Sequence, residues 1–178
     1  MKIAFLTLGC KLNYAETSTY ERGFKAAGLE VVPWSDKADI YLVNTCSVTA
    51  MSDSKSRNLI RKVHRVNPEA AVVVTGCSAQ LRRAEIEAIE GVTRVFGATE
   101  KQSVVPDTLA LMGLPAAGDS LRKDGVFGAF STGERTRSFL KVQDGCNNFC
   151  KYCTVPSARG ESRNIPISEC VCNARKIA

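Results

Sequence analysis

Histidine is almost missing from this chain, because His64 is the single one among 178 residues. The sequence also has no glycine-rich loop to cradle a phosphate, no paired catalytic carboxylates and no histidine dyad. These absences make acid–base hydrolysis a poor candidate for its chemistry. No apolar run approaches the roughly 20 residues that a membrane span needs, so we expect no membrane association.

The amino-terminal apolar stretch, residues 3–8, is too short for a signal sequence, and a polar segment with helical periodicity follows at once. We therefore predict a cytoplasmic protein. In that reducing compartment, cysteines as numerous as the eight found here more often bind metal or carry out redox chemistry than form disulfides. The net charge of +6 is compatible with a phosphate-rich partner but does not identify one.

Strands and helices alternate over residues 1–113. The hydrophobic patterns predict strands and helices at the following ranges: strands at 2–8, 39–44, 71–75 and 93–96, and helices at 13–27, 52–66, 80–90 and 101–112. This alternation predicts an α/β fold, namely a parallel sheet with helices on both faces. Residues 114–137 contain several glycines and no sustained period, which predicts a linker with a short β segment at 126–130.

Residues 138–178 begin a second unit. Residues 139–142 alternate like a strand, a cysteine-rich loop follows, and residues 167–178 have helical periodicity. The chain stops inside that helix, which would leave an apolar face unburied. We expect this stretch to be disordered, or to pack against the first unit or a second copy.

The cysteine-rich loop contains a CxxxCxxC run formed by Cys146, Cys150 and Cys153. Three thiolates this close can bind three corners of a cubane iron–sulfur cluster and leave the fourth iron open to a substrate or cofactor. The alternatives are a disulfide or a structural zinc site. Zinc needs four ligands, usually in CxxC pairs, and Cys170 or Cys172 could supply the fourth.

A second set of cysteines follows the apolar runs, at Cys10, Cys46 and Cys77. Each would lie at the carboxyl end of a parallel strand just before a helix, the edge at which open α/β sheets bind ligands. Gly9 and Gly76 would let backbone N–H groups approach cluster sulfurs. The alternative is that these cysteines are merely small buried hydrophobic residues.

The residues around both sets resemble the signatures of one enzyme family. The segment 142–160, in which Pro156 and Arg159-Gly160 follow the third cysteine, is similar to the cluster motif of radical S-adenosylmethionine enzymes, especially their methylthiotransferase branch. The segments GCKLNYAE (9–16), NTCSVT (44–49) and TGCSAQ (75–80) resemble the three cysteine motifs of that branch's amino-terminal domain. The Lys-Leu-Asn after Cys10 is similar to the group that acts on threonylcarbamoyladenosine in tRNA.

This resemblance implies two 4Fe-4S clusters, one on each cysteine set, with S-adenosylmethionine on the open iron of the cluster at Cys146, Cys150 and Cys153. Tyr152 stands where the family keeps an aromatic near the adenine. An electron donor would reduce that cluster, a 5′-deoxyadenosyl radical would form, and the other cluster would carry the sulfur. The implied reaction adds a methylthio group to C2 of a modified adenosine next to the anticodon of a tRNA.

Three alternatives stay open: an isopentenyladenosine tRNA substrate, a ribosomal protein aspartate, and a non-catalytic metal-binding module. Residues 138–178 match only the first βα unit of the family's partial barrel. We therefore expect this chain by itself to be inactive.

Several polar residues have two interpretations. A stripe at Arg57, Arg61 and Arg65 could contact tRNA phosphates, although a solvated helix face is the favoured interpretation. Asn13 and Glu16 could hydrogen-bond near the cluster loop or cap the helix.

The carboxy-terminal residues with the same ambiguity are two arginines and two cysteines. Arg159 and Arg163 could contact S-adenosylmethionine or RNA, or be ordinary loop charges. Cys170 and Cys172 are predicted to be packing residues, one more exposed than the other.

Overall fold

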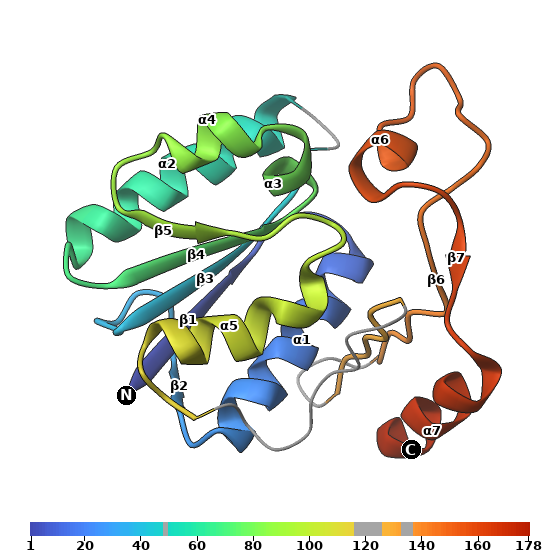
Figure 1. The fold of residues 1–178 in the computed structure, drawn as a ribbon, viewed down its shortest axis with the longest axis horizontal. Helices are drawn as coiled ribbons and strands as arrows, with labels where there is room; N and C mark the ends of the chain where they lie inside the picture. Colours follow the sequence, from blue (N-terminus) through green and yellow to red (C-terminus); the bar gives the residue numbers. More distant parts are fainter. Residues whose placement is uncertain (48–49, 116–125, 133–136) are drawn as a thin grey trace.

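A twisted parallel sheet forms the centre of the molecule (Figure 1). The computed structural model describes residues 1–47, 50–115, 126–132 and 137–178. The five strands of the central sheet are β1 (Lys2–Thr7), β2 (Glu30–Val32), β3 (Ile40–Thr45), β4 (Ala71–Gly76) and β5 (Val92–Val95). Their order is β2-β1-β3-β4-β5, and every neighbouring pair is parallel. The predicted α/β fold is confirmed.

Helices cover both faces of this sheet (Figure 1). One face carries α1 (Lys11–Ala26) and α5 (Val104–Leu111), and a 3-10 turn, η1 (Lys101–Ser103), precedes α5. The other face carries α2 (Ala50–Val66), α3 (Cys77–Leu81) and α4 (Arg83–Glu87). Every residue of β3 and β4 is buried, as expected for strands covered on both sides. Among the helices that the structure describes, none has the length and apolar character to cross a bilayer.

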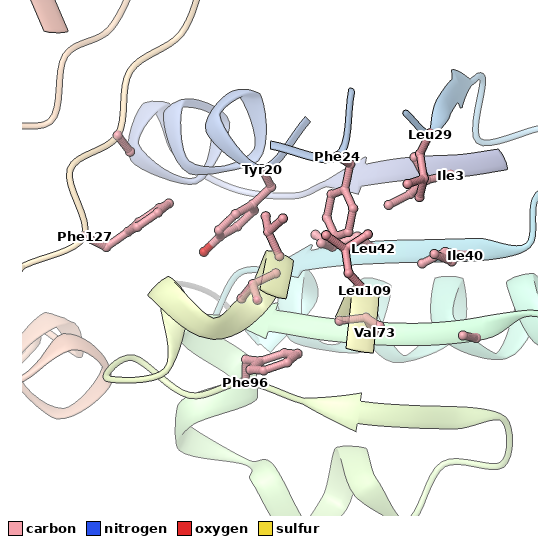
Figure 2. Packing of buried hydrophobic residues seen from close by; sticks show 14 of the residues in the cluster. Ile3, Tyr20, Phe24, Leu29, Ile40, Leu42, Val73, Phe96, Leu109 and Phe127 are labelled. Atoms are coloured by element: carbon pink, nitrogen blue, oxygen red, sulfur yellow. The ribbon is translucent and has the colours of Figure 1, made fainter. Parts of the chain in front are cut away.

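The two faces of the sheet form two hydrophobic clusters, because successive strand residues point to opposite sides. On the first face, Phe24 of α1 and Leu109 of α5 point toward Leu42 of β3 (Figure 2). On the second face, Val43 of β3 packs with Ile60 of α2. Full burial of each such side chain stabilises the fold by about 1.5–3 kcal/mol. These clusters hold the carboxyl ends of β1, β3 and β4 in a fixed arrangement.

The second unit is smaller and irregular. It contains a two-stranded antiparallel ribbon, β6 (Gln143–Asp144) with β7 (Arg163–Asn164), and two helices, α6 (Val155–Arg159) and α7 (Ile167–Ile177). Helix α6 packs against α3, so the second unit lies beside the carboxyl edge of the sheet (Figure 1). Contact with the first unit was one of the expected outcomes for residues 138–178. Ile167 and Val171 of α7 are exposed.

The predicted secondary structure is wrong at several points, and the short strands β6 and β7 were not predicted. Strand β2 was not predicted, the helix at 80–90 is two helices separated at Arg82, and the strand at 139–142 does not form. That last segment instead forms one isolated antiparallel bridge, between Leu140 and Phe130, with backbone hydrogen bonds from Ser131 to Phe139 and from Lys141 to Ala129 on either side of it. The same bridge is all that appears of the predicted β segment at 126–130. The first βα unit of a barrel stays a prediction, and much of the predicted linker lies outside the described residues.

Candidate metal centre at the sheet edge

Cys10, Cys46 and Cys77 lie at the carboxyl ends of three neighbouring strands. Cys10 precedes α1 just after β1, Cys46 follows β3 directly, and Cys77 is the first residue of α3 after β4. The strand register aligns Thr7 with Asn44 and Thr45 with Gly76. The three cysteines are therefore at the same edge of the sheet, as predicted.

Glycine brings the first two of these loops into contact. Gly9 has φ +103°, and a Cβ placed there would lie 2.6 Å from the Cβ of Cys46 and 2.7 Å from its Sγ. Gly76 has the same φ, and a Cβ there would collide with the carbonyl oxygen of Thr45. Only residues without a side chain fit both positions, so the backbone at Gly9 lies directly against the Cys46 sulfur.

Asn13 connects the loops that precede two of the cysteines. Its Nδ2 donates to the carbonyl oxygen of Leu8 at 2.8 Å and to that of Thr45 at 2.9 Å. Its Oδ1 accepts from Arg159 Nη2 at 2.7 Å and lies 3.9 Å from the Cys10 Sγ. No side-chain hydrogen bond caps α1. The capping interpretation of Asn13 is therefore wrong, and hydrogen bonding beside the cysteine loop is confirmed.

A buried ion cluster lies next to this edge and joins the two units. It consists of Glu16, Lys101, Lys141, Asp144 and Arg159. Glu16 Oε1 accepts from Lys101 Nζ at 2.8 Å and from Lys141 Nζ and Arg159 Nη1 at 3.1 Å. Asp144 accepts from Lys141 Nζ at 2.7 Å and from Arg159 Nη1 at 3.0 Å. No member has a side chain more than 5% exposed.

The cations of this cluster hold its two carboxyl groups in the ionised state, whereas burial lowers the pKa of Lys141. Burial by itself would raise the pKa of Glu16, but Lys101, Lys141 and Arg159 lower it to about 2. The same three cations outweigh burial at Asp144 and hold the pKa of that carboxyl well below its usual range. The cluster therefore contains real ion pairs rather than neutral acids.

The cysteines differ in exposure. Cys46 and Cys77 are buried, with 4% and 8% of their surface exposed, whereas Cys10 is exposed. Burial raises the pKa of the Cys77 thiol, and the nearby Arg159 guanidinium opposes that rise. A metal ligand must be the thiolate, so the arginine favours the form of Cys77 that ligation requires.

The second cysteine set lies in the loop between β6 and α6. The N–H of Cys146 donates to the carbonyl oxygen of Gly160 at 3.1 Å, and the N–H of Cys153 donates to that of Cys150 at 2.9 Å. The loop contains Phe149 at φ +44°, an uncommon backbone conformation for a residue with a side chain. Tyr152 is 90% exposed, and its place near an adenine stays a prediction.

The donor type fits an iron–sulfur cluster at each set, since each set has three free cysteines and Gly9 places no side chain against the Cys46 sulfur. Within the described ranges, no three His, Cys, Asp or Glu side chains are arranged to hold one metal ion. Ligands of a single ion must all meet at that ion. In a cubane each thiolate binds its own iron, so the sulfurs stand farther apart.

The remaining sequence predictions have mixed outcomes. Arg159 is not an ordinary loop charge, because it is buried in the ion cluster, and its contact with S-adenosylmethionine or RNA stays a prediction. Arg163 Nη2 donates to the Arg159 carbonyl oxygen at 2.9 Å. Cys172 is more exposed than Cys170, as predicted.

The helix α2 stripe agrees with the favoured interpretation of a solvated face. Arg61 and Arg65 are exposed, and Arg57 lies 3.5 Å from Glu85.

Sequence reasoning missed Lys101, Lys141 and Asp144. The available signal was weak: Lys141 and Asp144 interrupt an apolar stretch at a spacing of three residues. Nothing in the pattern indicated that both side chains are buried against α1.

Comparison with known proteins gives two kinds of match. A family described as "Uncharacterized protein family UPF0004" matches residues 2–97, which is more than half of the chain. Threonylcarbamoyladenosine tRNA methylthiotransferase MtaB of Bacillus subtilis (strain 168) is 41% identical over 183 residues, covering 98% of this chain and 40% of the relative. The MtaB of Aquifex aeolicus (strain VF5) is 38% identical, covering 100% and 45%.

A further relative is ribosomal protein uS12 methylthiotransferase RimO of Roseiflexus sp. (strain RS-1), 30% identical and covering 100% of this chain and 43% of the relative. The chain thus spans less than half the length of these curated relatives. The predicted resemblance to methylthiotransferases is confirmed. Because residues 2–97 include the whole central sheet with Cys10, Cys46 and Cys77, this chain belongs to the family UPF0004.

Proposed function

We propose that this chain is part of a tRNA methylthiotransferase of the radical S-adenosylmethionine type, acting at C2 of threonylcarbamoyladenosine. The observation that carries the proposal is the placement of Cys10, Cys46 and Cys77 at one edge of the sheet, on the ends of three adjacent strands. A second set, at Cys146, Cys150 and Cys153, stands in the unit that packs against that same edge. Each set supplies three thiolates for a 4Fe-4S cluster.

The bound cofactors, two clusters and S-adenosylmethionine, would supply the one-electron and methyl-transfer chemistry that an aromatic C–H bond demands, because that bond is too nonpolar for side-chain acids and bases. The protein's own residues have other tasks. The sheet holds the first cysteine set on rigid strand ends, Asn13 fixes the spacing of two of the loops, and burial of Cys46 and Cys77 limits water around them. Tyr152 is the proposed contact for the adenine of S-adenosylmethionine.

The proposed substrate rests on the relatives. The MtaB proteins from Bacillus subtilis and Aquifex aeolicus, at 41% and 38% identity, are named for threonylcarbamoyladenosine tRNA, while RimO from Roseiflexus, at 30%, is named for ribosomal protein uS12. The higher identities favour tRNA over the ribosomal protein. A cytoplasmic location and an electron donor are further parts of the proposal.

Cluster loading tests the proposal. The chain is reconstituted anaerobically with iron and sulfide, together with two triple variants, one replacing Cys10, Cys46 and Cys77 by alanine and the other replacing Cys146, Cys150 and Cys153. We expect about four iron atoms per cluster, so the unchanged chain should hold about twice the iron of either triple variant. Matched controls are Cys170→Ala and Cys172→Ala, which should leave the iron content unchanged.

Tightly bound zinc after aerobic purification, with no iron uptake, would instead support a structural metal module. The substrate is tested separately. The full-length protein is given, in parallel, tRNA that carries threonylcarbamoyladenosine without the methylthio group and ribosomal protein uS12, and methylthio products are detected by mass spectrometry. Product on the ribosomal protein alone would overturn the tRNA assignment.

A further inference from the structure

Counted over the residues that the structure describes, the buried ion cluster is not neutral. It contains three cations, Lys101, Lys141 and Arg159, against two carboxylates, Glu16 and Asp144. Burying an uncompensated charge is costly, so an excess positive charge in a dry site calls for a negative partner nearby. Within the described part of the chain, these five side chains form ion pairs only with one another.

The excess charge lies next to the first cysteine set. Arg159 ends α6, which packs on α3, the helix that begins at Cys77. Its guanidinium acts electrostatically on the Cys77 thiol and donates to Asn13 Oδ1 at 2.7 Å. Asn13 in turn donates to the carbonyl oxygen of Thr45, the residue before Cys46. One buried arginine is thus linked to all three cysteine loops, and it comes from the unit that carries the second set.

A cubane bound by three thiolates has net negative charge, since three thiolates outweigh the charge of the oxidised iron–sulfur core. Such a negatively charged cubane would supply the negative partner that the buried ion cluster lacks. A cluster at the first cysteine set would therefore face a positive charge that is fixed in place before the cofactor binds.

We propose that Arg159 is a positioning residue that sets the reduction potential of a cluster held by Cys10, Cys46 and Cys77, through the excess positive charge of the buried ion cluster. The inference rests on the proposed function, because it needs a cluster at that site. A positive charge stabilises the reduced, more negative form, so it raises the potential. The unit with Cys146, Cys150 and Cys153 would thereby tune the cofactor of the other unit.

The test uses the chain in which Cys146, Cys150 and Cys153 are replaced by alanine, so that only the first set can be loaded. The reconstituted cluster is titrated anaerobically with a reductant and followed by electron paramagnetic resonance. Arg159→Gln removes one positive charge and should lower the midpoint by about 59 mV, equivalent to a tenfold change in the ratio of reduced to oxidised cluster. Glu16→Gln removes one negative charge and should raise the midpoint by a similar amount.

Two further variants separate charge from packing. Arg159→Lys keeps the charge and should keep the midpoint potential close to that of the parent, although the hydrogen bond from the guanidinium to Asn13 is lost. Arg175→Gln removes an exposed arginine of α7 and should change nothing. Because the midpoint is read only from molecules that hold a cluster, reduced stability or occupancy does not shift it.

Midpoint shifts of opposite sign for Arg159→Gln and Glu16→Gln support the inference. Unchanged midpoints, or shifts of the same sign, overturn it and leave the proposed function intact. A parent that binds no cluster at all overturns the proposed function and the inference with it. If Arg159→Gln cannot be folded, Glu16→Gln and Arg159→Lys still decide between these outcomes.

Discussion

The substitution Glu16→Gln tests how the two units are held together. Glu16 Oε1 accepts hydrogen bonds from three cations, and 1% of its side chain is exposed. Its pKa falls from 4.5 to about 2 in the folded protein, which corresponds to about 3 kcal/mol of free energy of unfolding. Independently of the pKa, removing one partner of a buried ion pair typically lowers the free energy of unfolding by about 3–5 kcal/mol. We therefore expect Glu16→Gln to lower the free energy of unfolding by about 3–5 kcal/mol at pH 7.

The contribution of Glu16 to the free energy of unfolding should also depend on pH, and it should fall as the pH falls. The folded pKa of Glu16 is depressed, so its stabilising effect is complete above about pH 4.5 and is lost as the pH falls toward 2. The variant lacks this titration. The difference in free energy of unfolding between the unchanged chain and the variant should consequently narrow as the pH falls from about 5 toward 2.

Urea denaturation followed by circular dichroism, repeated across this pH range, measures both effects. The matched control is Glu21→Gln in the same helix, where the partner is Lys25 at 2.6 Å on the partly exposed surface. That pair should contribute less than about 1 kcal/mol. A difference for Glu16→Gln below about 0.5 kcal/mol at pH 7, or one that does not change with pH, would refute the reasoning.

Three other predictions follow from single contacts. Gly9→Ala should destabilise the chain by about 1–3 kcal/mol and reduce iron uptake, because its Cβ would meet the Cys46 sulfur. The control is Gly28→Ala, also at positive φ but with open space around it, and its iron uptake should not change. Asn13→Ala should cost about 2–4 kcal/mol by thermal denaturation, since it removes the donor to the carbonyl oxygens of Leu8 and Thr45 and the acceptor of Arg159 Nη2. Asn58→Ala on the exposed face of α2 should stay within about 0.5 kcal/mol. Leu42→Ala should cost about 2–5 kcal/mol without changing the iron bound per folded molecule, and a large loss of iron from soluble folded protein would contradict the separation of core and site.

The central sheet could be predicted from local patterns, because β3 and β4 are continuous apolar runs and the helices between them have clear periodicity. Strand β2 escaped prediction because it has three residues and none is buried. The strand expected at 139–142 failed for a different reason. Its alternation is real, but Lys141 turns into the ion cluster against Glu16 instead of facing solvent.

The cysteine positions were also predictable, since each follows an apolar run and strand ends meet at one edge. The buried ion cluster was not. Glu16 is 85 residues from Lys101, 125 from Lys141 and 143 from Arg159 in the sequence, and charged side chains are usually exposed. Only the packing of the second unit on α1 and α3 brings these groups together.

The central claim is that two separate sets of three thiolates each hold a cubane. Crystals of the anaerobically reconstituted chain, measured at the iron absorption edge, test it most directly. The account predicts two iron centres, one between the loops that carry Cys10, Cys46 and Cys77 and one in the loop of residues 146–153. A single centre shared by both sets, or iron-free electron density with the six cysteines paired in disulfides, would contradict it.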